Sequence, residues 1–154
     1  MGRVEVLIGE LGMRRHPEGG YYSEVYRSAT EVSAGGRRRR AVSVIYFLLP
    51  EGEFSRLHRV RWDEVWSIYE GELELLWVRD DELHRRHLGR VGKGVRPFAV
   101  VPGGSWQAAR PLSGYALVSC AVAPGFEWED FEMLRESVEK EEVLGRFPEL
   151  KSLL

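Results

Sequence analysis

Side-chain amides are almost missing from this chain. Its 154 residues include no asparagine and a single glutamine, Gln107. A shortage of residues that deamidate on heating is typical of proteins from hot-growing organisms. A GC-rich genome would by itself explain the excess of arginine over lysine. The position of the one remaining amide in a motif described below is therefore harder to attribute to chance.

Cysteine and long apolar runs are also scarce. The only cysteine, Cys120, lies in the apolar run ALVSCAVA, which indicates a packed thiol in a reducing compartment rather than a disulfide. No apolar run approaches the roughly 18 residues that a membrane span requires, and no secretory signal is evident. We therefore expect a cytoplasmic protein that does not contact a membrane.

Charge of either sign is not in large excess. The net charge of −2 argues against a general nucleic-acid binder. Four consecutive arginines, Arg37–Arg40, have no aromatic residues among them, so we expect the segment 33–40 to be an exposed, solvated loop. Apolar residues make up 44% of the chain, which at this length is enough for the core of one domain over residues 1–154.

Short apolar segments separated by glycine and proline predict the secondary structure. Helical spacing or capping residues favour helices over residues 3–11, 137–144 and 148–154. Strands are predicted over residues 21–27, 41–49, 65–69, 72–77, 83–88, 97–101, 105–110 and 115–123. We expect a tight turn at Gly71 between the third and fourth of these strands. The pattern indicates an all-β sandwich or barrel with short N- and C-terminal helices.

The stretch from Gly52 to Gly71, GEFSRLHRVRWDEVWSIYEG, carries the strongest functional candidates. His58 and Glu64 are separated by an even number of residues, so on a strand they share the face of Trp66. Two ionisable groups beside a large aromatic ring indicate a half-buried site. The pair could bind a metal, transfer protons or form a structural hydrogen bond.

The same stretch resembles the first motif of the cupin superfamily, in which a glycine precedes a His-x-His pair, a glutamate and a closing glycine. Gly52, His58, Glu64 and Gly71 match that spacing, while Val60 stands in place of the second histidine. This resemblance implies a double-stranded β-helix, the jelly-roll barrel of the superfamily. It also implies a homodimer, because relatives pair through their sheet edges and a bare edge favours aggregation.

A second segment, PGGSWQ at residues 102–107, resembles the second cupin motif, Pro-x-Gly-x-x-His, with Gln107 in the histidine position. Arg96 and Pro111 stand where that motif has glycine and asparagine. Together with HPEGGYYSEVYR, VIYFLLPEG and SCAVAPGFEWEDFE, the two motifs resemble an uncharacterised branch of cupins over residues 11–133.

The resemblance leaves a poor set of metal ligands. Of the usual positions only His58, Glu64 and Gln107 carry a polar side chain, and an amide oxygen binds soft divalent ions weakly. We therefore expect no tightly bound metal and no other cofactor.

Cupins that resemble sugar-nucleotide epimerases work without metal, using a histidine base and a tyrosine acid. This likeness favours an epimerase or isomerase that moves protons on a sugar or sugar-derived acid. The catalytic candidates are His58, Glu64 and Tyr22, with Glu64 bound to His58 so as to raise its pKa and leave one ring nitrogen free. A non-catalytic ligand-binding or sensor protein and a metal-dependent enzyme are the alternatives.

Further candidates are residues that we expect to contact the small-molecule ligand. They are Gln107, Trp106, Trp66, Glu24 and Ser55. Gln107 and Tyr22 would donate hydrogen bonds to an oxygen on which negative charge develops. Trp106 is expected in the pocket beside Gln107, whereas Trp77 is expected in the core.

Overall fold

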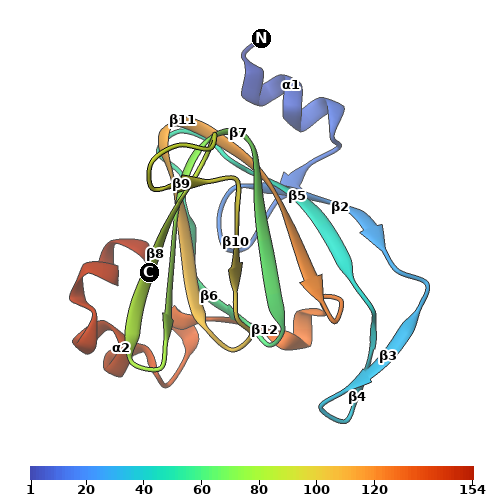
Figure 1. Cartoon of the computed structure of the whole chain (residues 1–154), viewed down its shortest axis with the longest axis vertical. Coiled ribbons are helices and arrows are strands. Elements are labelled where there is room, and N and C mark those ends of the chain that lie inside the picture. The colour runs from blue at the N-terminus through green and yellow to red at the C-terminus, as the bar shows by residue number, and fades with distance from the viewer.

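Two long strands, β7 (Asp63–Arg79) and β11 (Trp106–Ala123), organise the molecule by pairing with each other along their length. The computed structural model describes residues 1–154 and shows both strands running through the body of the protein (Figure 1). Both bend near their middle, so that one continuous sheet folds over into two layers. The fold is the predicted all-β jelly roll, although its path of hydrogen bonds does not close into a ring.

The first layer contains the first half of β7 and the second half of β11. Its other strands are β1 (Arg14–Arg15), β2 (Tyr21–Arg27), β5 (Ser43–Leu49) and β10 (Phe98–Val101). The second layer contains the remaining halves of β7 and β11. Its other strands are β6 (Ser55–Val60), β8 (Glu82–Leu88), β9 (Val95–Arg96) and β12 (Phe131–Met133). Of these only β8 was predicted. Because β6 is separate from β7, His58 and Glu64 do not share the face of one strand, as the sequence led us to expect.

Gly71 is the bend in β7, and the prediction of a tight turn between two strands is wrong. Inward-facing side chains change there from even positions, such as Trp66, to odd positions, such as Leu73. In the sequence, a change of the inward-facing side chains from even to odd positions is the pattern expected of two separate strands joined by a turn. Gly71 has φ +79°, and a Cβ atom there would lie 2.1 Å from the carbonyl oxygen of Tyr115 on β11. The predicted strands over 105–110 and 115–123 are likewise one bent strand.

Three apolar clusters hold the layers and helices together. The largest lies between the layers and includes Phe47, Trp66 and the predicted core residue Trp77. A second cluster covers the outer face of the second layer with the C-terminal helices α2 (Lys140–Arg146), η2 (Leu134–Glu136) and η3 (Pro148–Leu153). The third joins the first layer to helix α1 (Arg3–Glu10). None of these helices is long and apolar enough to span a membrane.

The C-terminal helices differ in detail from the prediction. The helix expected over residues 137–144 begins only at Lys140 as α2, and residues 148–153 form a 3-10 helix. Another short 3-10 helix, η1 (Trp128–Asp130), was not predicted.

The four consecutive arginines do not form a solvated loop, which corrects the prediction for residues 33–40. They make up β4 (Arg37–Arg40), which pairs with β3 (Glu31–Ala34) in a hairpin that extends away from the two layers (Figure 1). Arg39 is buried, and its guanidinium group binds the Asp130 carboxylate at 2.8 Å. A row of arginines is stable in this strand because aspartate and glutamate carboxylates lie against it.

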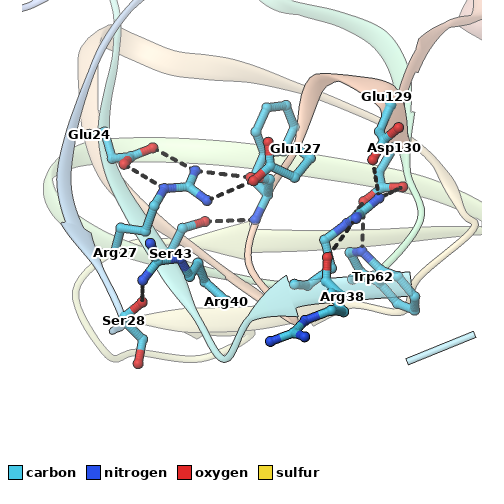
Figure 2. Close-up of polar contacts among 12 residues, drawn as sticks. Glu24, Arg27, Ser28, Arg38, Arg40, Ser43, Trp62, Glu127, Glu129 and Asp130 are labelled. Carbon is cyan, nitrogen blue, oxygen red and sulfur yellow. Dashed lines mark hydrogen bonds and ion pairs between the residues drawn. The ribbon is translucent and has the colours of Figure 1, made fainter. Parts of the chain in front are cut away.

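Residues 124–131, which we call the covering segment, run from the end of β11 to the first residue of β12. Figure 2 shows how polar contacts fasten this segment. Arg27 binds Glu24 on its own strand and Glu127 on the segment, and the Trp62 indole donates to Asp130 at 2.9 Å. The backbone N–H of Phe126 donates to Ser43 Oγ at 2.9 Å. The segment is therefore held against β2, β4 and β5.

The bend at Gly71 predicts a specific loss of stability. Gly71→Ala should lower the free energy of unfolding by about 3 kcal/mol, because the strained φ angle and the displaced Tyr115 carbonyl both contribute. Gly52→Ala is the matched control, since Gly52 has φ +80° but no neighbouring atom within 4 Å of the place that a Cβ would occupy. It should lose only about 1 kcal/mol. Equal losses in urea unfolding would contradict this account of the bend.

Candidate functional site

A cavity of about 100 Å³ lies between the two layers. At roughly 30 Å³ per molecule, that volume corresponds to about three water molecules. His16, Glu18, His58, Glu64 and Cys120 all line it, together with aromatic side chains of the covering segment. The cavity is therefore small, and it is rich in groups that can carry protons.

His58 enters the cavity from β6, where it pairs in register with Gln107 on β11. Its Nδ1 lies 2.7 Å from the carbonyl oxygen of Arg56. A carbonyl can only accept, so Nδ1 carries a proton. Its Nε2 lies 3.2 Å from Oε2 of Glu18. Both ring nitrogens are therefore engaged by the protein.

These contacts correct the expected pairing of His58 with Glu64. The carboxyl group that binds His58 belongs to Glu18, and no ring nitrogen is left free for a ligand. Burial lowers the pKa of His58 to about 4, whereas the sequence led us to expect a raised pKa. His58 is therefore neutral near pH 7.

Glu18 is the residue that the sequence reasoning missed. Only 5% of its surface is exposed, and Ser55 Oγ donates to its Oε1 at 3.0 Å. Burial, and next the charge of Glu64, raise the pKa of Glu18 well above its ordinary value. Because Nδ1 of His58 already holds its proton, Glu18 and Nε2 of His58 share one proton between them. No signal in the turn His16–Gly20 identifies this role, since its partners lie almost forty residues along the chain.

Glu64 is held by a chain of side-chain hydrogen bonds. The Trp66 indole donates to Oε1 of Gln107 at 3.0 Å, so the Gln107 amide nitrogen faces Glu64 and donates to its Oε1 at 2.7 Å. Burial raises the pKa of Glu64 to about 7, partly opposed by hydrogen bonds from Gln107 and Cys120. A carboxyl group that titrates near neutral pH can both accept and donate a proton there.

Of three further residues predicted at the site, Tyr22 and Glu24 line the cavity and Ser55 lies behind its wall. Tyr22 lines the cavity, and its hydroxyl accepts from Arg14 Nε at 3.1 Å. Glu24 also lines it, but both of its carboxylate oxygens accept from Arg27. Ser55 is fully buried behind Glu18.

The prediction that Trp106 lines the pocket is wrong. Trp106 packs against the C-terminal helices on the outer face of the second layer, with the Arg59 guanidinium 4.2 Å from its ring centre. Adjacent residues on a strand point to opposite faces. Gln107 points inward, so its neighbour must point outward.

The donors around the cavity do not fit the metal centre that cupin motifs usually build. Val60 is apolar, and the Gln107 carbonyl oxygen already accepts from Trp66. His58 has no nitrogen free. No three side chains of histidine, cysteine, aspartate or glutamate are grouped so that they could hold an ion.

The raised pKa of Glu64 predicts how stability changes with pH. The folded chain binds the Glu64 proton more tightly than the unfolded chain, so its burial costs nothing below the ordinary pKa of 4.5. The cost then grows until the pH passes about 7. The Glu64→Gln variant does not bear the cost of burying a charged carboxylate. Between pH 4.5 and about 7 its free energy of unfolding should therefore rise relative to that of the parent, by up to about 3 kcal/mol.

Urea unfolding of both proteins at a series of pH values measures this difference. The lowered pKa values of His16 and His58 act in the opposite direction, because the cost of protonating them appears as the pH falls. Both histidines are present in parent and variant, so their effect largely cancels. A difference that stays flat with pH would show that Glu64 is ionised throughout.

Comparison with known proteins places the chain in a family. A family model described as "Cupin superfamily (DUF985)" matches residues 5–134. A hypothetical protein from Leishmania major has a similar structure, with 35% identity, a TM-score of 0.83 and coverage of 97% of this chain and 94% of that one. A protein from Shewanella oneidensis is 34% identical, with a TM-score of 0.84 and coverage of 99% and 95%.

Two further matches have lower sequence identity. An uncharacterized protein from Saccharomyces cerevisiae is 26% identical over 92% of this chain and 80% of its own length. Oxalate decarboxylase from Bacillus subtilis shares the fold alone, with 16% identity, a TM-score of 0.59 and coverage of 91% of this chain and 37% of that one. The resemblance inferred from the two motifs is confirmed, and the chain belongs to the cupin superfamily, in the family described as DUF985.

Proposed function

We propose that the cavity binds a small polar carbonyl compound, most simply a sugar or a sugar-derived acid, and moves a proton on it. The observation that carries this proposal is the buried Glu64 carboxyl, whose pKa is about 7 and which faces a cavity. Burying such a group costs stability, and carboxyl groups with perturbed pKa values in cavities are typical of acid–base sites.

The proposed reaction is an epimerisation or isomerisation. The Glu64 carboxylate removes a proton from the carbon next to the carbonyl group, and the electron pair of that C–H bond moves into an enolate. If the planar enolate turns over in the cavity, return of the proton to the same carbon gives the epimer. Return to the neighbouring carbon, with transfer of the hydroxyl proton to the former carbonyl oxygen, gives the isomer. Either return restores Glu64. A positioned base of this kind contributes on the order of 10² to 10⁴ in rate. Gln107 acts as a positioning residue, because its amide fixes the carboxyl group.

The size of the cavity limits the substrate. A cavity of roughly 150 Å³ holds benzene, so a cavity of about 100 Å³ suits a molecule of no more than about six non-hydrogen atoms. A triose or a small sugar acid would fit inside the jelly roll. Any nucleotide attached to a sugar would have to remain outside.

Proton exchange in heavy water tests the proposal. We expect the protein to exchange carbon-bound protons of at least one compound in a panel of small aldoses, ketoses, sugar acids and sugar nucleotides, followed by proton NMR. Glu64→Gln should reduce the rate by about 10² or more, because it removes the base. Glu51→Gln, at an exposed turn position, is the control and should match the parent.

The same assay separates the alternatives. We expect exchange to survive mild chelation, with well under one equivalent of transition metal per chain in elemental analysis. A full equivalent of zinc, iron or manganese that survives chelation and is needed for exchange would establish a metal-dependent enzyme. Panel compounds that bind without any exchange would establish a non-catalytic binding protein.

We also propose that the protein is a homodimer, through the part of the outer face of the first layer that helix α1 leaves uncovered. One row of residues crosses five strands on that face without a charge: Tyr26, Val44, Ala121, Val65 and Val100. At its two ends Tyr26 is 53% and Val100 42% exposed. A two-fold contact would let this uncharged face meet its own copy.

Light scattering after size exclusion tests the dimer. We expect twice the chain mass of 17.7 kDa at micromolar concentration, and a monomer for Val100→Glu, since the new carboxylate would be buried without a partner. Arg90→Glu, on an exposed connection after β8, is the control and should remain dimeric. A parent mass of one chain would contradict the proposal.

A further inference from the structure

His16, in the turn before β2, has one ring nitrogen whose role the backbone determines. The N–H of Glu18 donates to Nδ1 of His16 at 3.2 Å. An accepting nitrogen carries no proton, so the neutral ring of His16 must carry its proton on Nε2. The local turn therefore selects the tautomer.

Nε2 of His16 has no partner in the protein. The only buried side-chain polar atoms that are both sealed from water and unpartnered are Ser23 Oγ and Trp106 Nε1. Nε2 is therefore open to the cavity that the His16 ring lines. His58 differs, since both of its nitrogens are engaged. Of the two histidines at the cavity, only His16 presents a free donor.

The surroundings of the His16 ring are aromatic. Its centre lies 4.7 Å from that of Tyr22 and 5.6 Å from those of Phe47 and Trp128. Only 7% of the side chain is exposed. The nearest carboxyl oxygen, Oε2 of Glu18, lies 3.7 Å from Nδ1, on the side of the ring that accepts. A hydrogen bond donated in such an apolar setting is stronger than one in water.

We propose that His16 donates its Nε2–H to the carbonyl oxygen of the substrate and is a catalytic residue of the proposed reaction. The inference rests on the proposed function and names the missing part of it. As Glu64 removes the proton from carbon, negative charge grows on the carbonyl oxygen, and the His16 hydrogen bond strengthens. His16 keeps its own proton throughout, so the carbon-bound proton moves only to and from Glu64. The ligand class is accordingly a small molecule with an accepting oxygen next to an exchangeable C–H.

Three substitutions at His16 separate the hydrogen bond from the shape of the ring. His16→Gln can place an amide N–H near the position of Nε2, His16→Asn places its amide nearer Nδ1, and His16→Phe keeps a ring without a donor. In the exchange assay we expect His16→Phe and His16→Asn to lose about 10² to 10³ in kcat/KM. His16→Gln should retain most of the rate. Circular dichroism and thermal melting confirm that each variant is folded.

Equal rates for the parent and His16→Phe would overturn the inference while leaving the proposed function intact. A parent that exchanges no compound in the panel would instead contradict the proposed function. In that case the contact proposed for His16 can still be tested by a binding measurement, which does not require the protein to turn over a substrate.

That measurement uses pyruvate, a small carbonyl compound, as the probe with ¹⁵N-histidine-labelled protein. Two-bond proton–nitrogen spectra of the free protein should show His16 protonated on Nε2, and addition of pyruvate should shift the Nε2 and Hε2 resonances. The spectrum of the His16→Gln variant lacks the His16 resonances, which assigns them in the spectrum of the parent. Protonation on Nδ1, or no response of His16 at tens of millimolar pyruvate, would overturn the proposed contact.

Discussion

The arrangement of the cavity depends on the burial of one carboxyl group, that of Glu18. A carboxyl group sealed from water is stable only if it is neutral or fully bonded. Ser55 and His58 supply those hydrogen bonds. Backbone groups then determine where the histidine protons lie. The Arg56 carbonyl keeps a proton on Nδ1 of His58, and the Glu18 N–H keeps Nδ1 of His16 unprotonated. One turn and one strand thus determine where the protons at this end of the cavity lie.

This pattern separates structural groups from groups that face a ligand. His58 and Glu18 satisfy each other and form a rigid wall. Glu64 and His16 remain, the first with a pKa near neutral pH and the second with a free N–H donor. A base and a donor in one cavity are the minimum that proton transfer next to a carbonyl group requires. Of the two motif positions that lack the usual histidine, Gln107 holds the Glu64 carboxyl group and Val60 contributes an apolar side chain to the cavity wall.

Much of this could be predicted from the sequence, because local spacing determines it. The motif spacing predicted that His58, Glu64 and Gln107 meet inside a jelly roll, and the three residues do lie together. The shared strand face inferred from the even separation of His58 and Glu64 is wrong, because His58 lies on β6 and Glu64 on β7. The prediction failed at Gly71, where the inward-facing side chains change from even to odd positions within one strand and were read as two strands. Trp106 was misplaced because a motif position was given more weight than the alternation of the strand. Glu18 and His16 could not be found, because their role depends on contacts between a turn and a strand far apart in the chain.

The positions of the protons in the cavity are the central claim, and neutron diffraction from a deuterium-exchanged crystal near neutral pH tests them most directly. The account predicts a deuteron on Nδ1 of His58 pointing at the Arg56 carbonyl, one between Nε2 of His58 and Oε2 of Glu18, and one on Nε2 of His16. A deuteron on Nδ1 of His16, or none between His58 and Glu18, would contradict it.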